Sequence, residues 1–239
     1  FQILATEKDS IRYISIDSPD IVEGHIEGHF NYKDLLKIAQ NSLGSIYANY
    51  ERIEVEPNQT VEFNFNIYNK IIEVFYPKVN LAPNTFVKGQ IDSNEDKIDL
   101  LLKSPKIKIA NNKFDEVKLQ INSKSPLYNT IISIDKIDTG IYEASNFNLV
   151  NVTLNDTLYI RTDFIGGPNK LENYDLSFYH TIDERGNSVV GIKKSEINFK
   201  NNQWFINENN NDLNKLVFDK NFETFVIDKI TMASGSQNV

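Results

Sequence analysis

Apolar and polar residues alternate along most of this chain. Between Val22 and Tyr32, the even-numbered residues are apolar, aromatic or glycine, and the odd-numbered residues are Glu, His or Asn. Successive side chains of a β-strand point to opposite faces, so this stretch is predicted to be one strand with an apolar side and a charged side. The same alternation returns up to the C-terminus and predicts a protein built mainly from β-strands.

The predicted strands are short and are separated by turns rich in Pro, Asn, Asp and Gly. Ser18-Pro19 interrupts one of them, because proline lacks an N–H. Ile14–Ile21 and Leu100–Ile107 share the order strand, Ser-Pro, strand, which suggests a weak internal repeat. Strands are expected at 11–16, 22–32, 61–67, 72–76, 86–91, 98–102, 106–109, 117–122, 127–135, 141–154, 157–164, 174–182, 188–193, 196–200, 203–207, 215–219 and 223–233.

One helix is predicted, from Lys33 to about Tyr50. A single apolar stripe runs along it with spacings of three and four residues, which is the pattern of an amphipathic helix. Asn31 is the expected N-cap, and Gly44 is expected to weaken the middle of the helix. A helix with one stripe must lie on an apolar surface, so the stripe is predicted to face the apolar side of the strands. Its members are Leu36, Ala39, Leu43, Ile46 and Tyr50.

So many strands with one helix cannot bury their apolar faces under helices. Two packed sheets, a closed barrel or one long sheet curled into a trough would solve this problem. The residues expected to face inward differ widely in size, from glycine to Phe and Ile, which favours a surface that lines space. We therefore predict residues 1–239 to form a single curled, antiparallel β-groove, with the helix as an insertion at 33–51.

Composition narrows the functional classes. The formal charge is −8, from 25 basic and 33 acidic residues, and the acidic balance argues against non-specific nucleic-acid binding. There is no cysteine, which excludes disulfides, thiolate metal sites and cysteine nucleophiles. No apolar run approaches the ~20 residues of a transmembrane helix. The first residue is Phe1 and the last stretch is strand-like, so a piece of a longer protein is expected.

Reactive chemistry has weak support in the sequence. Glu23, His25, Glu27 and His29 share one strand face at a spacing that could chelate a metal, but a solvated polar face is the favoured interpretation. His180 alternates with apolar neighbours and is interpreted as an inner-face residue. Acidic pairs lie mostly in predicted turns, and no phosphate-binding loop or nucleophile elbow occurs. A non-enzymatic protein without cofactors is expected, except that a lipid or detergent could be bound.

Several stretches resemble the β repeats of the TamB family, the translocation and assembly module subunit with its AsmA-like relatives. Residues 195–207 are similar to that family's S-x-I-x-F-x-x-x-x-W-x-I strand pair, through Ser195, Ile197, Phe199, Trp204 and Ile206. Residues 142–167 and 225–237 also resemble these repeats, and 28–35 followed by 40–43 is similar to a strand-then-helix element. Together the similar stretches cover most of the chain.

The resemblance implies a periplasmic segment of a large envelope protein of Gram-negative bacteria, anchored in the inner membrane outside this stretch. Proteins of this kind form a taco-shaped sheet with an apolar groove and act with a BamA-like outer-membrane barrel. The implied function is outer-membrane biogenesis, in which phospholipid acyl chains are held or conducted along the groove between the two membranes. No nucleic-acid partner and no transmembrane segment in this stretch are expected.

The residues predicted to line the lipid groove are apolar members of the alternating stretches. They are Phe63, Phe65, Ile67, Leu100, Ile107, Ile109, Val117, Leu119, Ile121, Leu158, Ile160, Ile197 and Phe199. The helix is expected to lie in or cap this groove. Two alternatives stay open at this stage: a β-sandwich module that binds carbohydrate or protein or acts in adhesion, and an enzyme acting on polysaccharide.

Overall fold

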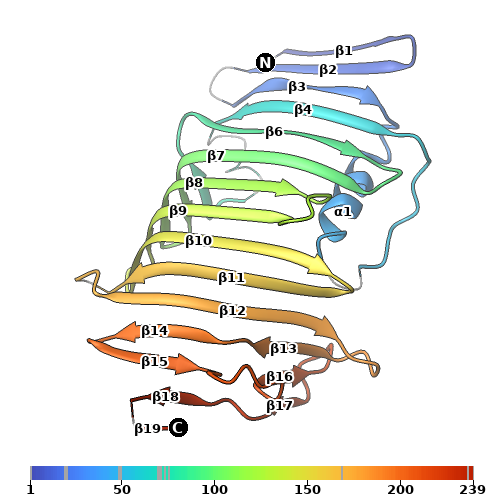
Figure 1. Cartoon of the computed structure of the whole chain (residues 1–239). Helices are drawn as coiled ribbons and strands as arrows, with labels where there is room; N and C mark the ends of the chain where they lie inside the picture. Colours follow the sequence, from blue (N-terminus) through green and yellow to red (C-terminus); the bar gives the residue numbers. More distant parts are fainter. Residues whose placement is uncertain are drawn as a thin grey trace.

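The chain folds into one long antiparallel β-sheet with a helix on one face (Figure 1). The computed structural model describes residues 2–18, 21–47, 50–68, 72, 74, 76–167, 169–235 and 237–238. Nineteen strands of this described part share a single sheet that is not closed. The prediction of a curled, mainly β protein with an amphipathic helix is confirmed.

The bounds of the strands are β1 Gln2–Lys8, β2 Ile11–Ser18, β3 Val22–His29, β4 Thr60–Ile67, β5 Val79–Leu81, β6 Thr85–Asp92, β7 Lys97–Ile109, β8 Asn112–Asn122, β9 Thr130–Asp138, β10 Glu143–Leu154, β11 Thr157–Gly166, β12 Glu172–Ile182, β13 Ser188–Ile192, β14 Ser195–Phe199, β15 Asn202–Ile206, β16 Lys215–Phe218, β17 Phe225–Ile227, β18 Met232–Ser234 and β19 Gln237–Asn238. Most strands pair with the next strand along the chain, but β4 pairs with β6, β5 with β7, β12 with both β13 and β14, β13 with β16, and β15 with β18. Strands β1 and β17–β19 lie at opposite ends of the sheet (Figure 1).

Three strand predictions need correction. The expected strand at 223–233 is split, because β17 ends at Ile227 and β18 begins at Met232. The expected strand at 72–76 is wrong, because Ile72 and Val74 are helical. The Tyr76 amide donates to the Ile72 carbonyl, which is the hydrogen bond of a helix. Residues 71, 73 and 75 lie outside the described residues. The Ser104-Pro105 break is also wrong, since both residues lie inside β7. The alternation in 22–32 is confirmed as strand over Val22–His29.

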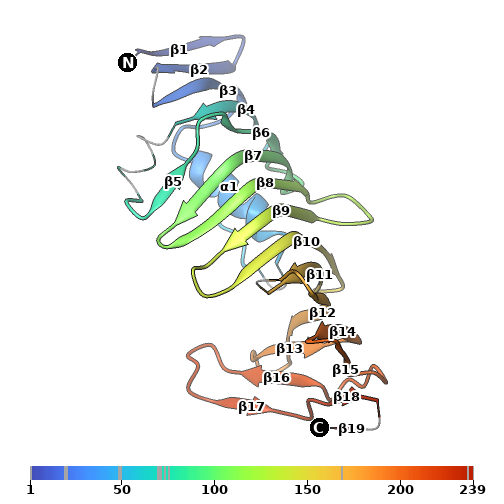
Figure 2. The same cartoon turned by 90° about the vertical axis from the view of Figure 1, so that its left-hand side faces the viewer.

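Four of the longest strands bend along a shared line, here called the crease. Pro105, Glu116, Asp135 and Asn146 occupy matching positions on β7, β8, β9 and β10, as the pairs on either side show. Proline has no N–H to donate, and Glu116 and Asn146 have positive φ values of 53° and 54°. Figures 1 and 2 show these strands bending, so that their ends project to the side of the sheet on which the helix lies.

The apolar pattern changes phase at the crease. One row of paired apolar residues crosses these strands on each side of the crease, and on each strand the two row members are five positions apart. On a flat strand, only residues an even number of positions apart lie on the same face. The pairs are Leu102 and Ile107 on β7, Leu119 and Phe114 on β8, Ile132 and Ile137 on β9, and Leu149 and Ala144 on β10. The kinked residue compensates for the odd spacing, so the apolar side continues around the bend.

The helix α1 spans Leu35–Gly44 and is shorter than the predicted 33–50. Its N-cap is Asp34 and not Asn31, whose side-chain amide donates to Glu56 instead. Gly44 is the last residue of α1, and the Tyr50 ring covers it so closely that a Cβ there would lie 2.3 Å from a ring carbon. The helix therefore stops where the chain turns back over it.

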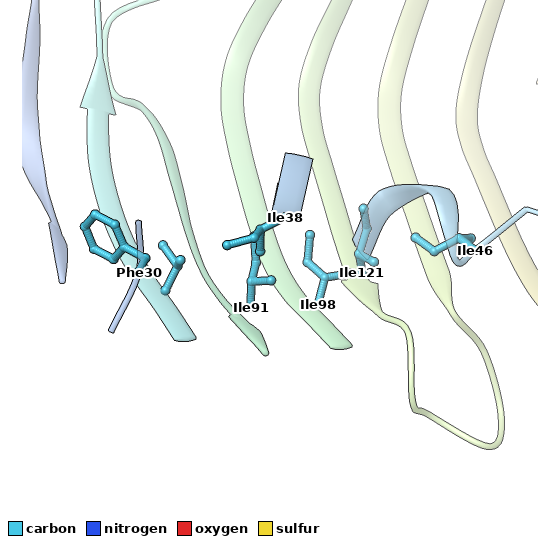
Figure 3. Packing of buried hydrophobic residues seen from close by; sticks show 7 residues of the cluster. Phe30, Ile38, Ile46, Ile91, Ile98 and Ile121 are labelled. Carbon is cyan, nitrogen blue, oxygen red and sulfur yellow. The ribbon is translucent and has the colours of Figure 1, made fainter. Parts of the chain in front are cut away.

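Helix α1 packs across the ends of several strands and forms the main apolar core (Figure 3). Ile38 on the helix and Ile98 on β7 are each only 1% exposed, and each fully buried Ile contributes ~1.5–3 kcal/mol. The Thr153 hydroxyl on β10 donates to the Ile46 carbonyl, so the helix end is also held by a hydrogen bond. The cluster comprises Phe30, Ile38, Ile46, Val61, Ile91, Ile98 and Ile121.

The predicted stripe of α1 is only partly the buried one. Ala39 and Ile46 pack against the core, but Leu36 and Leu43 are 70% and 41% exposed and Tyr50 lies outside the helix, so the predicted contacts of Leu36 and Leu43 with the strands are wrong. Asn41 and Ser42 are buried in their place. The helix is rotated in this way because the Asn41 side chain holds the returning chain at Ile53.

The Asn41 amide is expected to stabilise this fold measurably. Its Nδ2 donates to the Ile53 carbonyl at 2.8 Å and its Oδ1 accepts the Ile53 amide at 2.9 Å. Replacing Asn41 with Ala leaves both backbone groups without their partner and should lower the free energy of unfolding by ~2–4 kcal/mol, measured by urea denaturation. Gln40→Ala, on the exposed side of α1, is the control and should change it by less than ~0.5 kcal/mol. Equal effects of the two substitutions would contradict this role.

Candidate functional site

The apolar face on the side of α1 is the candidate site, and we call its part between α1 and the crease the trough floor. One row of paired residues crosses eleven strands on this floor, from β1 to β12 without β5. Ten strand spacings of about 4.8 Å give this row a length of roughly 48 Å. Its members, each paired with the next, are Ile3, Ile16, Gly24, Phe65, Val87, Leu102, Leu119, Ile132, Leu149, Thr162 and Leu176.

The floor row is apolar except at Thr162. The hydroxyl of Thr162 donates to the Asn148 carbonyl at 2.8 Å, so this polar group already has a partner. From Phe65 to Leu149 the side chains are half-buried, although the described residues place no second sheet over them. A concave wall of this kind offers apolar surface to an extended guest molecule.

The structure brings six predicted lining residues onto two neighbouring rows. Phe65 and Leu119 belong to the floor row. The other four lie on a second row beside it, closer to α1, which runs Ile14, Ile26, Phe63, Gly89, Leu100, Ile121, Thr130, Asn151, Ile160, Phe178 and Ile192. Polar residues interrupt this second row, so it is less uniform than the floor row.

The remaining predicted residues are more dispersed. Ile67 and Val117 lie next to the crease, where they pair with Thr85 and Ser104. Ile107 and Ile109 lie beyond the crease and pair with β5. Three more positions lie further along the sheet: Leu158 pairs with His180, Ile197 with Tyr174 and Trp204, and Phe199 with Asn202.

Two of the predicted lining residues are not available to a ligand. Ile121 is 6% exposed because it belongs to the core beneath α1, and Leu158 is 5% exposed. Their assignment as groove lining is therefore wrong. Ile109 and Phe199 are at the other extreme, 45% and 39% exposed near strand ends, and so contribute little to an enclosed surface.

Sequence reasoning predicted only two of the eleven floor-row residues as lining, Phe65 and Leu119. Val87, Leu102, Ile132, Leu149 and Leu176 also alternate with other residues, but many positions alternate, and only the pairing register shows which of them share a row. The crease and the Ser and Thr residues beside it gave no separate signal in the sequence.

Small buried polar side chains replace ladder bonds where strands bend or are split. The hydroxyls of Ser104 and Thr85 lie 2.6 Å apart, and Ser104 also donates to the Lys106 carbonyl. Further along, β13 and β14 meet at Lys193-Lys194, and the amide of Asn207 donates to the Ile192 carbonyl there. Asn214 accepts the Thr231 amide at 2.8 Å.

An aromatic cluster stands beside the crease at β10–β12. Phe164 stacks on Tyr174, with ring centroids 4.4 Å apart, and Phe147 lies 6.1 Å from Phe164. The Tyr142 and Tyr174 hydroxyls both donate to Glu172. Burial first, and then these hydrogen bonds, raise the pKa of Tyr142 well above that of a free phenol, so its hydroxyl stays protonated. The cluster therefore combines uncharged aromatic side chains with one carboxylate, Glu172, which accepts hydrogen bonds from two of them.

The opposite, outer face of β3–β7 is polar. Glu27, His29, Glu62 and Gln90 line a hollow of about 480 Å³ there, and Tyr13 stacks on His25 at 5.5 Å. Among the residues that the structure describes, no group of three His, Asp or Glu side chains is placed to hold a metal ion. The chemistry of this face is that of a hydrated charged surface.

Comparison with protein-family models, with curated proteins and with solved structures found no match for this chain. Within the described part of the chain, no helix has the length and apolar character needed to span a membrane.

The Asn214 side chain is expected to hold the split strands together at the C-terminal end of the sheet. Asn214→Ala should leave the Thr231 amide without its acceptor and accelerate its hydrogen exchange, with a local loss of ~1–3 kcal/mol. Asn209→Ala, at an exposed position of the same loop, should leave this exchange unchanged. The measurement is amide hydrogen exchange by NMR. Unaltered protection of Thr231 in the Asn214 variant would show that the bond does not support the loop.

Proposed function

We propose that this chain is a periplasmic segment of a TamB-like protein of a Gram-negative bacterium. In this proposal it supports outer-membrane biogenesis by holding or conducting phospholipid acyl chains along the trough floor between the inner and outer membranes. It acts without catalysing a reaction, and a BamA-like barrel engages the full-length protein. The resemblance of the repeats is one support, and the floor row, apolar at every position but Thr162, is the observation that carries the proposal.

The dimensions of the floor row suit an acyl chain. Its length of roughly 48 Å is about three times the ~15 Å that the chains of one leaflet span, taking half of a 30 Å hydrocarbon core. A lipid tail could therefore lie across many strands and still have free floor ahead of it. Movement along such a surface needs little change of partner chemistry, because the five consecutive positions from Val87 to Leu149 all carry aliphatic side chains.

The energetics also suit temporary occupancy. Full burial of one methylene contributes ~0.8 kcal/mol, and a chain on an open floor buries only one side of each methylene. For a tail of about ten methylenes this gives ~4 kcal/mol, comparable to the lower range of the cost of association, ~4–15 kcal/mol. Binding is then weak enough for release, as a conduit requires, while a sealed pocket would retain the lipid.

The alternatives have less support. A β-sandwich module needs two sheets packed face to face, whereas the described strands share one open sheet. An enzyme acting on polysaccharide needs carboxylates fixed across a cleft, and the anchored Glu172 is occupied by two tyrosine hydroxyls. Neither alternative explains why the floor row is aliphatic over so many strands.

The proposal is tested by placing a charge on the floor. Leu119→Glu puts a carboxylate in the middle of the floor row and should reduce the lipid that co-purifies with the chain several-fold, since an acyl chain lying over it would remove water from the carboxylate. The sheet should stay folded, because the half-buried carboxylate can reach water. The measurement is lipid extraction and mass spectrometry of the purified protein.

Gln120→Glu is the matched control for charge and position. Gln120 follows Leu119 on β8 and points to the outer face, so this variant should retain wild-type lipid. Circular dichroism of both variants checks the fold. Equal lipid recovery from the two variants, or no lipid in the wild-type protein after expression in a Gram-negative host, would refute the proposed function.

A further inference from the structure

The outer face of the sheet changes character at β10 and β11. Over β3–β7 it is polar, but here Val150 and Tyr159 are exposed by 38% and 39%. Leu127, in the loop between β8 and β9, is 80% exposed. The same strands carry Leu149 and Ile160 on the trough side. Strands that are apolar on both faces have a second apolar surface that the trough does not use.

A pocket of about 320 Å³ lies on this outer surface. Its apolar lining comes from the strands and from the loop, chiefly Leu127, Tyr128, Val150, Val152 and Tyr159. This volume is at the lower end of the ~300–1,000 Å³ of small-molecule sites, which combine an apolar lining with a few polar groups. The pocket is large enough for one small apolar group.

Hydrogen-bond donors gather at one side of the pocket. Arg161 and Ser177 are paired in the ladder on the outer face, and the Lys193 amide donates to the Ser177 carbonyl, so these three residues are neighbours. The apolar residues Leu127 and Val150 belong to the loop and to β10, while the donors belong to β11, β12 and the end of β13. The pocket therefore has an apolar side and a cationic side, which is the arrangement that an amphiphilic anion needs.

Both cations retain donors for a ligand. Arg161 binds Asp175 through Nε at 3.1 Å and Nη2 at 2.7 Å, which leaves Nη1. Lys193 contacts Asp212 at 2.8 Å with one of its three N–H groups and lies over the Tyr179 ring. These carboxylates hold the pKa of Arg161 and of Lys193 above their ordinary values, so both side chains stay charged.

The nearby carboxylates are themselves engaged. Asp175 and Asp212 each face one of the two cations, and Asp163 accepts the Asn148 amide at 3.1 Å. Exposed ion pairs of this kind contribute little stability and can share their cation with a second acceptor. An incoming anion can therefore add to the pairs without breaking them.

We infer that this outer pocket, lined by Val150, Tyr159 and Leu127 and bordered by Arg161, Ser177 and Lys193, binds a small carboxylate-headed amphiphile. The apolar body lies against the loop and β10, and the carboxylate accepts hydrogen bonds from the arginine, the serine hydroxyl and the lysine. This site is separate from the trough, because it lies on the opposite face of the same strands.

The test uses decanoate as the probe and decanol as its uncharged counterpart, followed by NMR chemical shifts of the whole chain. Decanoate is expected to shift the amides of 150–152, 159–161, 177 and 193, and decanol to bind about tenfold more weakly because it lacks the charge-assisted bonds. Val150→Glu should abolish decanoate binding by repulsion, while Val150→Lys, which is also charged but of opposite sign, should retain it.

Leu149→Gln distinguishes this pocket from the trough. Leu149 precedes Val150 and points to the trough floor, so its replacement should leave decanoate binding at the outer pocket unchanged. Loss of binding in Leu149→Gln with retention in Val150→Glu would overturn the inference and place the probe in the trough. Shifts absent from these amides, or equal affinity for decanoate and decanol, would also overturn it. The result does not depend on whether the full protein conducts lipid.

Discussion

Continuity of backbone hydrogen bonding is the constraint on which this structure depends. A sheet that bends along its length must interrupt its ladder at the bend, and each buried N–H or C=O left there without a partner costs ~1–3 kcal/mol. The chain places short polar side chains at these points. Beside the crease, the Thr85 and Ser104 hydroxyls donate to the Ala82 and Lys106 carbonyls, and Asn207 and Asn214 bond backbone groups where the C-terminal strands are split. Because these groups substitute for ladder bonds, the sheet can curve, and a curved sheet has a concave apolar side.

The sequence predicted the elements better than their arrangement. Alternation identified β3 and β4 and assigned Ile26 and Phe63 to one face, since a period of two is a local property. The register is not local, so Val87 and Ile132 could not be placed beside Phe65 and Leu119. Helix α1 was mispredicted at Leu36, because burial of a polar Asn41 against Ile53 decides its rotation, and apolar spacing gives no indication of that contact.

Stability is unevenly distributed along the sheet. The core beneath α1 draws on β4, β6, β7 and β8, and it contains the most completely buried aliphatic side chains. After Val189, no apolar side chain of the described chain is fully buried, and the buried groups are instead Ser195, Asn207 and Asn214. Regions held by hydrogen bonds over little apolar area open more easily than regions with a packed core. The end of the sheet formed by β13–β19 is therefore the more deformable part of the trough.

The two apolar faces of β10 have a consequence for how that strand finds its place. In most half-buried strands, slipping by one residue is prevented because it would turn the hydrophobic side toward water. On β10 such a slip would exchange Leu149 for Val150, and the solvation energy would hardly change. Alignment there must come from geometry: the bulge between Ser145 and Asn148, with Asn146 at a φ of 54°, together with the bond from Thr162 to the Asn148 carbonyl. These few atoms fix the register of β10, and the register decides which of its two apolar faces lines the trough.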